Sequence, residues 1–492
     1  MKVLVANRGE IAVRILRACR DLGMDSVSVY SEADREALHV RYADEAVAIG
    51  PTPAAESYLN ISRLVEAAQA SGVDAIHPGY GFLSENPRFA AAVEDAGLVF
   101  VGPRPRTLAL TGDKLAARRA ARVCELPVLP GSDEPLGEEL PDHLLAEVEY
   151  PVLVKAAAGG GGRGIRLAQS AEELETMIEV ARTEAHAAFG DDTVYLEPLV
   201  QRARHIEVQI VGDGQGHVLC LGERECSIQR RRQKLIEESP ANGLTDTQRT
   251  FLYDAAVRLG QSLDYRSVGT VEFLLGDDGA FHFIEVNPRI QVEHPVTEMV
   301  TGLDLVHEQL RLAAGHPLRY AQEYVDLRGA AIEARVLAED PAQSFIPAVG
   351  KVSYLKEPGG PGIRVDSALY HGMPVTTDYD SMLAKVIAWG ENRDAAIARL
   401  RRALREFQIG GVTTDLEFLM KVVESGPFVT GRIDTTYLDT FRPQSNGEDQ
   451  ALTRDAALAA ALLAHLRTRD ASEPVRSGHN GGWRAAGWRE QM

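Results

Sequence analysis

Cysteine, long apolar runs and a leader segment are scarce or missing in this chain of 492 residues. Its four cysteines, Cys19, Cys124, Cys220 and Cys226, match no metal-binding or redox motif, so we expect reduced thiols in the core. The first residues, MKVLVANRGE, lead directly into an expected strand rather than a secretory signal. No apolar run reaches the length needed to cross a bilayer. These absences predict a cytoplasmic protein with no membrane partner.

The charge balance also excludes some partners. The net charge of −19 argues against a surface dedicated to nucleic acid or to anionic lipid, although a local basic cluster can still bind phosphates. Hydrophobic residues make up 45% and charged residues 25%, which is ordinary for a globular protein. The length predicts more than one domain.

The stretch from Val268 to Val300 contains the strongest local pattern. Two strand-like runs, Thr270–Leu275 and Ala280–Val286, flank the turn signal Asp278-Gly279. With those two residues as the loop, Glu272 falls directly opposite Glu285. Facing carboxylates destabilise a sheet unless something neutralises them, and a hard divalent cation would do so. The alternative is an ordinary solvated face.

Further polar residues follow this hairpin. Asn287 lies on the same face as Glu285 and adds a third oxygen ligand, so Glu272, Glu285 and Asn287 are the candidate metal ligands. A dense polar cluster comes next: Arg289, Gln291, Glu293 and His294.

The first 110 residues alternate strands with helices. Expected strands at 3–6, 26–30, 75–77 and 99–101 are separated by helices, which predicts a doubly wound α/β unit. The loop His77–Phe82 follows a strand end, where such sheets place ligands. Its two aromatics, Tyr80 and Phe82, are expected either to be exposed for packing on a flat organic substrate or to belong to the core.

A glycine-rich segment, YPVLVKAAAGGGGRGIRLAQ, follows a turn-rich linker. Its G-x-G-x-x-G spacing does not indicate a dinucleotide fold, because a strand-like alternation rather than a helix comes next. It is also no Walker A loop, since Ile165 stands where lysine is needed. We expect two strands joined by a flap whose backbone N–H groups approach phosphates, with Lys155 beside it. A flexible surface hairpin is the alternative.

Basic residues cluster between two further strands. The segment ERECSIQRRRQK contains Arg224, Arg230, Arg231, Arg232 and Lys234. In an acidic protein this cluster suggests a polyanion such as a nucleoside triphosphate, the alternative being a solvated basic face. Lys114 at an expected helix start suggests a nearby anion or solvent.

These motifs together resemble the biotin carboxylases, the ATP-grasp components of biotin-dependent carboxylases. The resemblance covers about residues 1–440. The chain is similar above all to the amino-terminal part of bacterial acyl-CoA carboxylase α subunits. The segments that carry it are ANRGEIAVRILRACRDLG, AIHPGYGFLSENPRFA, TGDK, VLVKAAAGGGGRGIRL, RHIEVQI, GERECSIQRRRQK, VEFLL, FHFIEVNPRIQVEHPVTEM, IEARVLAED and DYDSMLAKVI.

The resemblance implies a fold class and domain organisation. It implies an N-terminal doubly wound α/β domain at 1–112, an ATP-grasp domain at 113–330 with a mobile glycine-rich lid at about 130–203, and a mixed α/β C-terminal domain at 331–442. A linker, a short helix at 452–466 and a disordered tail are expected in 443–492.

The resemblance also implies roles for individual residues. The expected catalytic residues are Glu293 as the base, Arg289, Arg335 and Lys234. The expected nucleotide, bicarbonate and biotin contacts are Lys114, Lys155, Gly160, Gly161, Gly162, Glu197, Leu199, His205, Gln229, Leu274, Gln291, Val292 and Tyr80. Glu272, Glu285 and Asn287 would hold Mg²⁺ or Mn²⁺, in agreement with the hairpin pairing.

The implied reaction is the MgATP-dependent carboxylation of biotin by bicarbonate through carboxyphosphate. Arg232 departs from a histidine common in relatives, and Pro288 from a threonine. No Ala-Met-Lys-Met biotinylation site is present, so this sequence is not expected to carry its own biotin: either the carrier is a separate chain or the sequence is truncated. A carboxyltransferase is expected as a further partner, and a homodimer is possible. The alternatives are another ATP-grasp carboxylate–amine ligase and a non-catalytic nucleotide-binding subunit.

Overall fold

The computed structural model of the chain describes residues 1–132, 134–137, 150–157, 164–442, 456–462 and 465. They belong to two compact units, Met1–Phe441 and Arg442–Met492. In the second unit, residues 456–462 are helical, in agreement with the central part of the helix expected at 452–466. Within the described residues, no helix combines the length and the apolar character that a membrane crossing requires.

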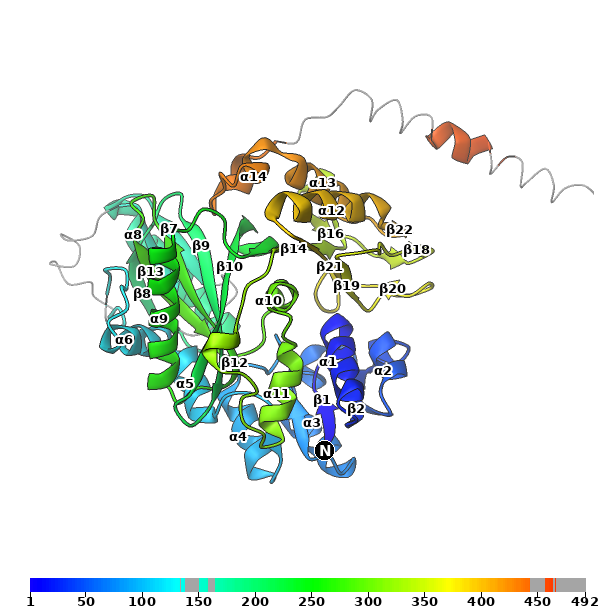
Figure 1. Ribbon diagram of the computed structural model, residues 1–492, viewed down its shortest axis with the longest axis horizontal. Coiled ribbons are helices and arrows are strands. Elements are labelled where there is room, and N and C mark those ends of the chain that lie inside the picture. The colour runs from blue at the N-terminus through cyan, green and yellow to red at the C-terminus, as the bar shows by residue number, and fades with distance from the viewer. Residues whose placement is uncertain (133, 138–149, 158–163, 443–455, 463–464, 466–492) are drawn as a thin grey trace, which may run out of the picture. The chain divides into compact units, whose positions relative to one another are not determined.

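The N-terminal part contains a five-stranded parallel sheet, as the alternating pattern predicted (Figure 1). In sheet order the strands are β3 (Glu45–Gly50), β2 (Asp25–Ser31), β1 (Lys2–Val5), β4 (Ala75–His77) and β5 (Val99–Phe100). Its helices include α1 (Gly9–Asp21), α2 (Leu38–Tyr42), α3 (Ile61–Ala70), α4 (Pro87–Asp95) and α5 (Pro105–Gly112). Sequence analysis missed β3, an edge strand in which half of the residues are exposed.

A small antiparallel sheet contains the glycine-rich segment. Its order is β7 (Ile165–Ala168), β6 (Val152–Ala156) and β8 (Val194–Pro198), with α8 (Ala171–Phe189) packed against it. Lys155 pairs with Ile165, so the predicted order of strand, glycine loop and returning strand is confirmed. The loop itself, including Gly160, Gly161 and Gly162, lies outside the described residues.

The largest sheet has eight antiparallel strands. In order they are β13 (Phe281–Asn287), β12 (Arg266–Leu275), β9 (Arg204–Asp213), β10 (Val218–Arg230), β11 (Gln233–Ser239), β14 (Ala330–Leu337), β21 (Met382–Gly390) and β19 (Ile363–Ser367). Because β11 pairs with β14, this sheet continues across the boundary expected at 330/331 between the ATP-grasp and C-terminal domains.

Helices cover this sheet in separate groups. Helices α6 (Lys114–Val123) and α9 (Asp246–Ser262) pack beside β9, β10 and β13 (Figure 1). Helices α10 (His294–Thr301) and α11 (Leu305–Ala313) follow the β12–β13 hairpin, and α12 (Arg393–Glu406) packs on β21. Shorter helices are α13 (Leu416–Glu424), α14 (Gly426–Val429) and α15 (Tyr437–Thr440).

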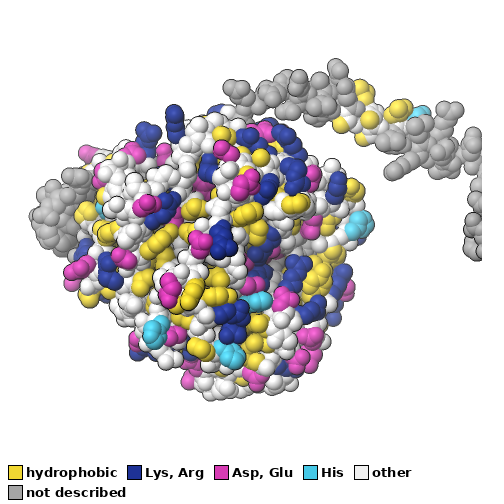
Figure 2. All heavy atoms as spheres, in the orientation of Figure 1, with side chains coloured by type: hydrophobic (Ala, Val, Ile, Leu, Met, Phe, Trp, Pro, Cys, Tyr) yellow, Lys and Arg dark blue, Asp and Glu magenta, His cyan; other side chains and the backbone are white. Residues whose placement is uncertain are grey.

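Three two-stranded sheets complete the C-terminal part. They pair β15 (Glu339–Asp340) with β16 (Ile346–Pro347), β17 (Gly350–Lys351) with β20 (Pro374–Val375), and β18 (Tyr354–Lys356) with β22 (Gln408–Gly410). On the face shown in Figure 2, acidic and basic side chains are interspersed rather than gathered into a field of one sign.

The β12–β13 hairpin places Glu272 opposite Glu285, as predicted, although the turn differs from the expectation. The loop has three residues rather than two, because Gly276 pairs with Ala280. An extra residue in β13, Ile284, forms a bulge that restores the expected register at the glutamates. The longer loop and the bulge shift the register by one residue in opposite directions, so the pairing of the glutamates is unchanged.

Candidate active site

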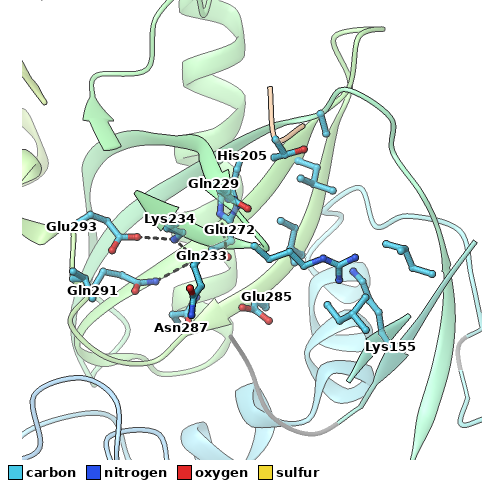
Figure 3. A pocket seen from close by; sticks show the side chains of 18 of the residues that line it. Lys155, His205, Gln229, Gln233, Lys234, Glu272, Glu285, Asn287, Gln291 and Glu293 are labelled. Atoms are coloured by element: carbon cyan, nitrogen blue, oxygen red, sulfur yellow. Dashed lines mark hydrogen bonds and ion pairs between the residues drawn. The ribbon is translucent and has the colours of Figure 1, made fainter. Parts of the chain in front are cut away.

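A cavity of about 530 Å³ lies between the large sheet, the small sheet and the N-terminal part. Every predicted site residue that the structure describes lines it: Glu293, Arg289, Arg335, Lys234, Lys114, Lys155, Glu197, Leu199, His205, Gln229, Leu274, Gln291, Val292, Tyr80, Glu272, Glu285 and Asn287. In Figure 3, Gln291 and Glu293 lie at one side of the cavity and Lys155 at the other.

Alternation along the hairpin directs the candidate metal ligands into this cavity. Phe273 and Phe283 point to the hydrophobic core, whereas Glu272 and Glu285 line the cavity. The bulge at Ile284 is essential for this, because regular alternation from Phe283 would turn Glu285 toward the core.

Lys234 joins three carboxylates at one end of the cavity. Its Nζ donates to Glu207 at 2.6 Å, to Glu272 at 2.9 Å and to Glu293 at 2.6 Å. Burial acts to raise the pKa of Glu272, but the charges of Lys234 and His205 outweigh it, so the pKa is lowered. The pKa of Lys234 is raised by its carboxylates although burial opposes this. The lysine is therefore a cation at neutral pH.

Glu293 lies between two cations. Besides Lys234, the Nη2 of Arg335 donates to its Oε2 at 2.8 Å. Burial works to raise the pKa of Glu293, but the attraction of Lys234 and Arg335 holds it well below its ordinary value. Glu293 is thus ionised and able to accept a proton, and its position immediately before α10 points it into the cavity.

Arg335 connects Glu293 to a buried acidic pair. Its Nε donates to Glu237 at 2.6 Å. Glu237 faces Glu333 directly across β11 and β14, and both side chains are fully buried. Burial raises the pKa of Glu237 to about 7, with Arg335 opposing, and raises the pKa of Glu333 well above its ordinary value.

Arg289 and Gln291 order the loop before Glu293. Arg289 donates to Gln291 Oε1 and to Glu85 Oε1, both at 2.5 Å, and Gln291 Nε2 donates to Glu272 at 3.3 Å. The loop thus presents a guanidinium and an amide next to a carboxylate, a set of groups suited to binding a small planar anion such as bicarbonate.

The other side of the cavity contains two further lysines, Lys155 and Lys114. Lys155 Nζ bonds Glu197, which also bonds the buried Arg118 at 2.5 Å. Lys114 Nζ lies 3.7 Å from Glu285, and His205 Nε2 lies 3.2 Å from Glu272. Lysines that converge on a cavity from α6 and β6 are suited to the charge of phosphates.

The hairpin oxygens fit a divalent cation. Glu272 and Glu285 face each other in the cavity with Asn287 beside them, all at least nine-tenths buried except Glu285. Burial raises the pKa of Glu285 against the charge of Lys114, and repulsion from Glu272 raises it further. A hard cation would relieve this repulsion, and carboxylate and amide oxygens are the ligands that it prefers.

The structure decides between the two alternatives left open for the aromatics of the loop 77–82. Tyr80 and Phe82 are half-buried rather than exposed: the Tyr80 hydroxyl donates to Glu10, and Phe82 stacks on Tyr58 with ring centroids 5.0 Å apart. Tyr80 lines the cavity, whereas Phe82 belongs to an aromatic cluster of the core.

The basic cluster does not act as one surface. Arg224 is fully buried, with Glu207, Gln209, Thr270 and Thr297 as partners. Arg230 bonds Glu339, and Arg231 is exposed at the β10–β11 turn. Of the five cations, Lys234 and Arg232 line the cavity.

Sequence analysis missed part of the lining. The missed residues are Leu129, Leu153, Ile165, Pro198, Val200, Ala203, Gln233, Ile284, Leu337, Glu339, Asp380, Ser381, Met382 and Thr435. Most are apolar, so in the sequence they resemble core residues. The polar ones, which include the consecutive Asp380 and Ser381 and Gln233 next to Lys234, show no side-chain pattern that marks them as cavity residues.

Comparisons with known families match nearly the whole first unit. Residues 1–108 match "Biotin carboxylase, N-terminal domain", residues 113–321 match "Carbamoyl-phosphate synthase L chain, ATP binding domain", and residues 333–440 match "Biotin carboxylase C-terminal domain".

Individual relatives agree with this assignment. Biotin carboxylase of Allochromatium vinosum is 48% identical over 89% of this chain and 98% of the relative. A pyruvate carboxylase subunit of Methanothermobacter thermautotrophicus is 45% identical over 95% of this chain and 99% of its own. The biotin carboxylase domain of 2-oxoglutarate carboxylase from Hydrogenobacter thermophilus, a dimer solved with MgADP, ADP and bicarbonate, is 45% identical, with a TM-score of 0.86 over 89% of this chain and 97% of that one. The chain belongs to the biotin carboxylase family of ATP-dependent ligases.

Proposed function

We propose that this chain carboxylates the biotin of a carrier protein or domain, with bicarbonate as the carbon source and MgATP as the energy source. The observation that carries the proposal is the arrangement of Glu293 between Lys234 and Arg335, in a cavity that also contains the phosphate-suited lysines and the hairpin carboxylates. We assign the division into 1–112, 113–330 with a lid at about 130–203, 331–442 and 443–492 as part of the same proposal.

Glu293 is the base of the first step. It removes the proton of bicarbonate, whose oxygen then attacks the γ-phosphorus of ATP to form carboxyphosphate and ADP. The pKa of Glu293 is low in the free protein because Lys234 and Arg335 are its partners. Bound bicarbonate and phosphate draw on the same two cations, so substrate binding raises the pKa of Glu293 toward the range of an effective base.

Arg289 and Gln291 hold bicarbonate in the orientation from which its oxygen attacks ATP, with the Val292 backbone beside them. Lys114, Lys155, His205, Gln229 and the glycines of the flap, Gly160, Gly161 and Gly162, bind the phosphates and ribose. The backbone around Glu197 and Leu199, together with Leu274, holds the adenine. These residues line one cavity, apart from the three glycines, which lie outside the described residues.

Glu272, Glu285 and Asn287 would hold Mg²⁺ or Mn²⁺, which neutralises charge that develops on the transferring phosphate. Tyr80 and Arg335 serve the second step, in which carboxyphosphate breaks down to CO₂ and phosphate. The phosphate takes the ureido proton of biotin, and Arg335 stabilises the resulting enolate next to CO₂.

A carboxyltransferase consumes carboxybiotin, and we expect this partner and a biotin carrier protein or domain in the cytoplasm. The resemblance to acyl-CoA carboxylase α subunits favours an acyl-CoA as the final acceptor. A 2-oxo acid is the second candidate, because the alignment with the pyruvate carboxylase relative extends over 489 residues. Assay of the complex purified with its native partners, with acetyl-CoA, propionyl-CoA and pyruvate as acceptors, distinguishes them.

The experiment that tests the half-reaction measures ADP release with and without bicarbonate and free biotin. We expect release that depends on bicarbonate and is stimulated by biotin. Glu293→Gln should abolish it, since loss of a general base costs about 10²- to 10⁴-fold in rate. Nucleotide binding, measured by calorimetry, should persist in this variant. An unchanged rate in Glu293→Gln would remove the proposed base.

A further inference from the structure

Two cations hold consecutive residues of the loop that leads to the base. Lys385 of β21 pairs directly with Arg335 of β14. The Arg335 guanidinium reaches the carboxylate of Glu293, and Lys385 Nζ donates to the backbone oxygen of Val292 at 2.8 Å. Facing cations on neighbouring strands destabilise a sheet unless each has an anion, so this arrangement calls for an explanation.

Lys385 has no exposed surface and does not line the cavity. Its ammonium lies 3.2 Å from Glu10 Oε1 on α1 and 3.9 Å from Asp366 Oδ2 on β19. Asp366 already forms an ion pair with Arg364 at 2.7 Å, so Glu10 is the main ion-pair partner of Lys385. Lys385 thus connects the N-terminal sheet region to the loop.

Glu10 continues the connection to the other side of the cavity. The same oxygen that faces Lys385 accepts the Tyr80 hydroxyl, and Tyr80 lines the cavity. The path Tyr80–Glu10–Lys385–Val292 therefore joins the side where we place biotin to the loop where we place bicarbonate. None of its links involves the lysines on the nucleotide side.

We propose that Lys385, together with Glu10, is a positioning pair that fixes the Gln291–Glu293 loop and Tyr80 relative to each other. The inference rests on the proposed function, because it assigns bicarbonate to the loop and biotin to Tyr80. It predicts that loss of the pair weakens the use of bicarbonate and of biotin and leaves ATP affinity unaltered.

The test compares Lys385→Met, Glu10→Gln and the double variant in the ADP-release assay. Because a buried hydrogen bond to a charged group is lost, we expect KM for bicarbonate to rise about 10- to 100-fold in Lys385→Met, with KM for ATP unchanged. Glu10→Gln should chiefly reduce the stimulation by biotin. The double variant should resemble Lys385→Met, since both substitutions act on one path.

A matched control separates positioning from general stability. Arg249 of α9 also bonds a buried carboxylate, Glu223, and two backbone oxygens, but it does not line the cavity. Arg249→Met should lower thermal stability without altering either KM. Hydrogen exchange of the loop peptide 289–293 in the substrate-free protein should accelerate in Lys385→Met and not in Arg249→Met.

The KM values for bicarbonate and ATP decide whether Lys385 and Glu10 act as a positioning pair. An unchanged KM for bicarbonate, or an equal rise in KM for ATP, overturns the pair as a positioning device. If Lys385→Met does not fold, Glu10→Gln decides, and unaltered biotin stimulation in that variant overturns the proposal. If the unmodified protein releases no ADP in response to bicarbonate, the proposed function fails instead.

Discussion

Single residues around the base determine which groups are charged. Lys234 contacts three carboxylates and Arg335 contacts two, so the ionised state of Glu293 depends on both cations. That Glu272, Glu285 and Asn287 lie together was predictable from the hairpin, whereas Glu293 was singled out from its polar cluster by the family resemblance. Glu207 and Glu237 were not, because an acid in a strand gives no sign of whether it faces a lysine or water.

Glu285→Gln should raise the Mg²⁺ concentration required for half-maximal ADP release. Removal of one of two anionic ligands weakens a divalent cation site, and we expect a shift of about 10- to 100-fold. Titration of Mg²⁺ at constant ATP measures it. Asp278→Asn, at the exposed turn of the same hairpin, is the control. An equal Mg²⁺ requirement in Glu285→Gln and the unmodified protein would contradict the assignment.

Among the elements, the β12–β13 hairpin has the predicted pairing of Glu272 with Glu285, although the predicted two-residue loop was wrong. The turn signal and alternation predicted two strands, but a bulge cannot be recognised from alternation alone, because Phe-His-Phe-Ile-Glu reads equally well with either loop length. Tertiary packing selects the longer loop: with it, both Phe273 and Phe283 enter the core while both glutamates remain in the cavity.

Arg118→Met should destabilise the junction of α6 with the small sheet. Arg118 is 2% exposed, bonds Glu197 at 2.5 Å, and bonds the Leu129 oxygen at 2.8 Å. Loss of one partner from a buried ion pair costs about 3–5 kcal/mol, so the melting temperature should fall. Arg106→Met, which breaks the exposed pair with Asp264, should change it little. Equal melting temperatures for the two variants would contradict this reasoning.

At the scale of the whole molecule, Glu238 of β11 couples stability to pH through Arg393 of α12. Burial raises the pKa of Glu238 from 4.5 to about 7, with Arg393 opposing. The folded protein therefore retains a proton that the unfolded chain releases, and the free energy of unfolding falls as pH rises through this interval.

Glu238→Gln removes this titration. The decrease in stability between pH 5 and pH 8 should become smaller by about 3 kcal/mol, which chemical denaturation at each pH measures. Glu424→Gln, on the surface of α13, supplies the control. An identical pH dependence for Glu238→Gln and the unmodified protein would show that this carboxyl does not titrate in the expected interval.

The chain 1–441 should retain the half-reaction in full. All residues that line the cavity precede Phe441, and that side chain packs against Phe418 and Tyr437, so the cut leaves the aromatic contact intact. We expect the same kcat and KM values for bicarbonate and ATP. A loss of turnover in a folded 1–441 protein would place part of the site in the second unit.

The continuous eight-stranded sheet limits which parts of the site can move relative to each other. Because β11 and β14 share a hydrogen-bond ladder, the hairpin carboxylates and Arg335 travel together. The small sheet shares no ladder with it in the described chain, and its two connections are tethered where Phe283 bonds Pro127 and Thr435 bonds Ala203. We infer that the small sheet, as the lid we propose, would hinge between these two hydrogen bonds, and that the large sheet would keep its place.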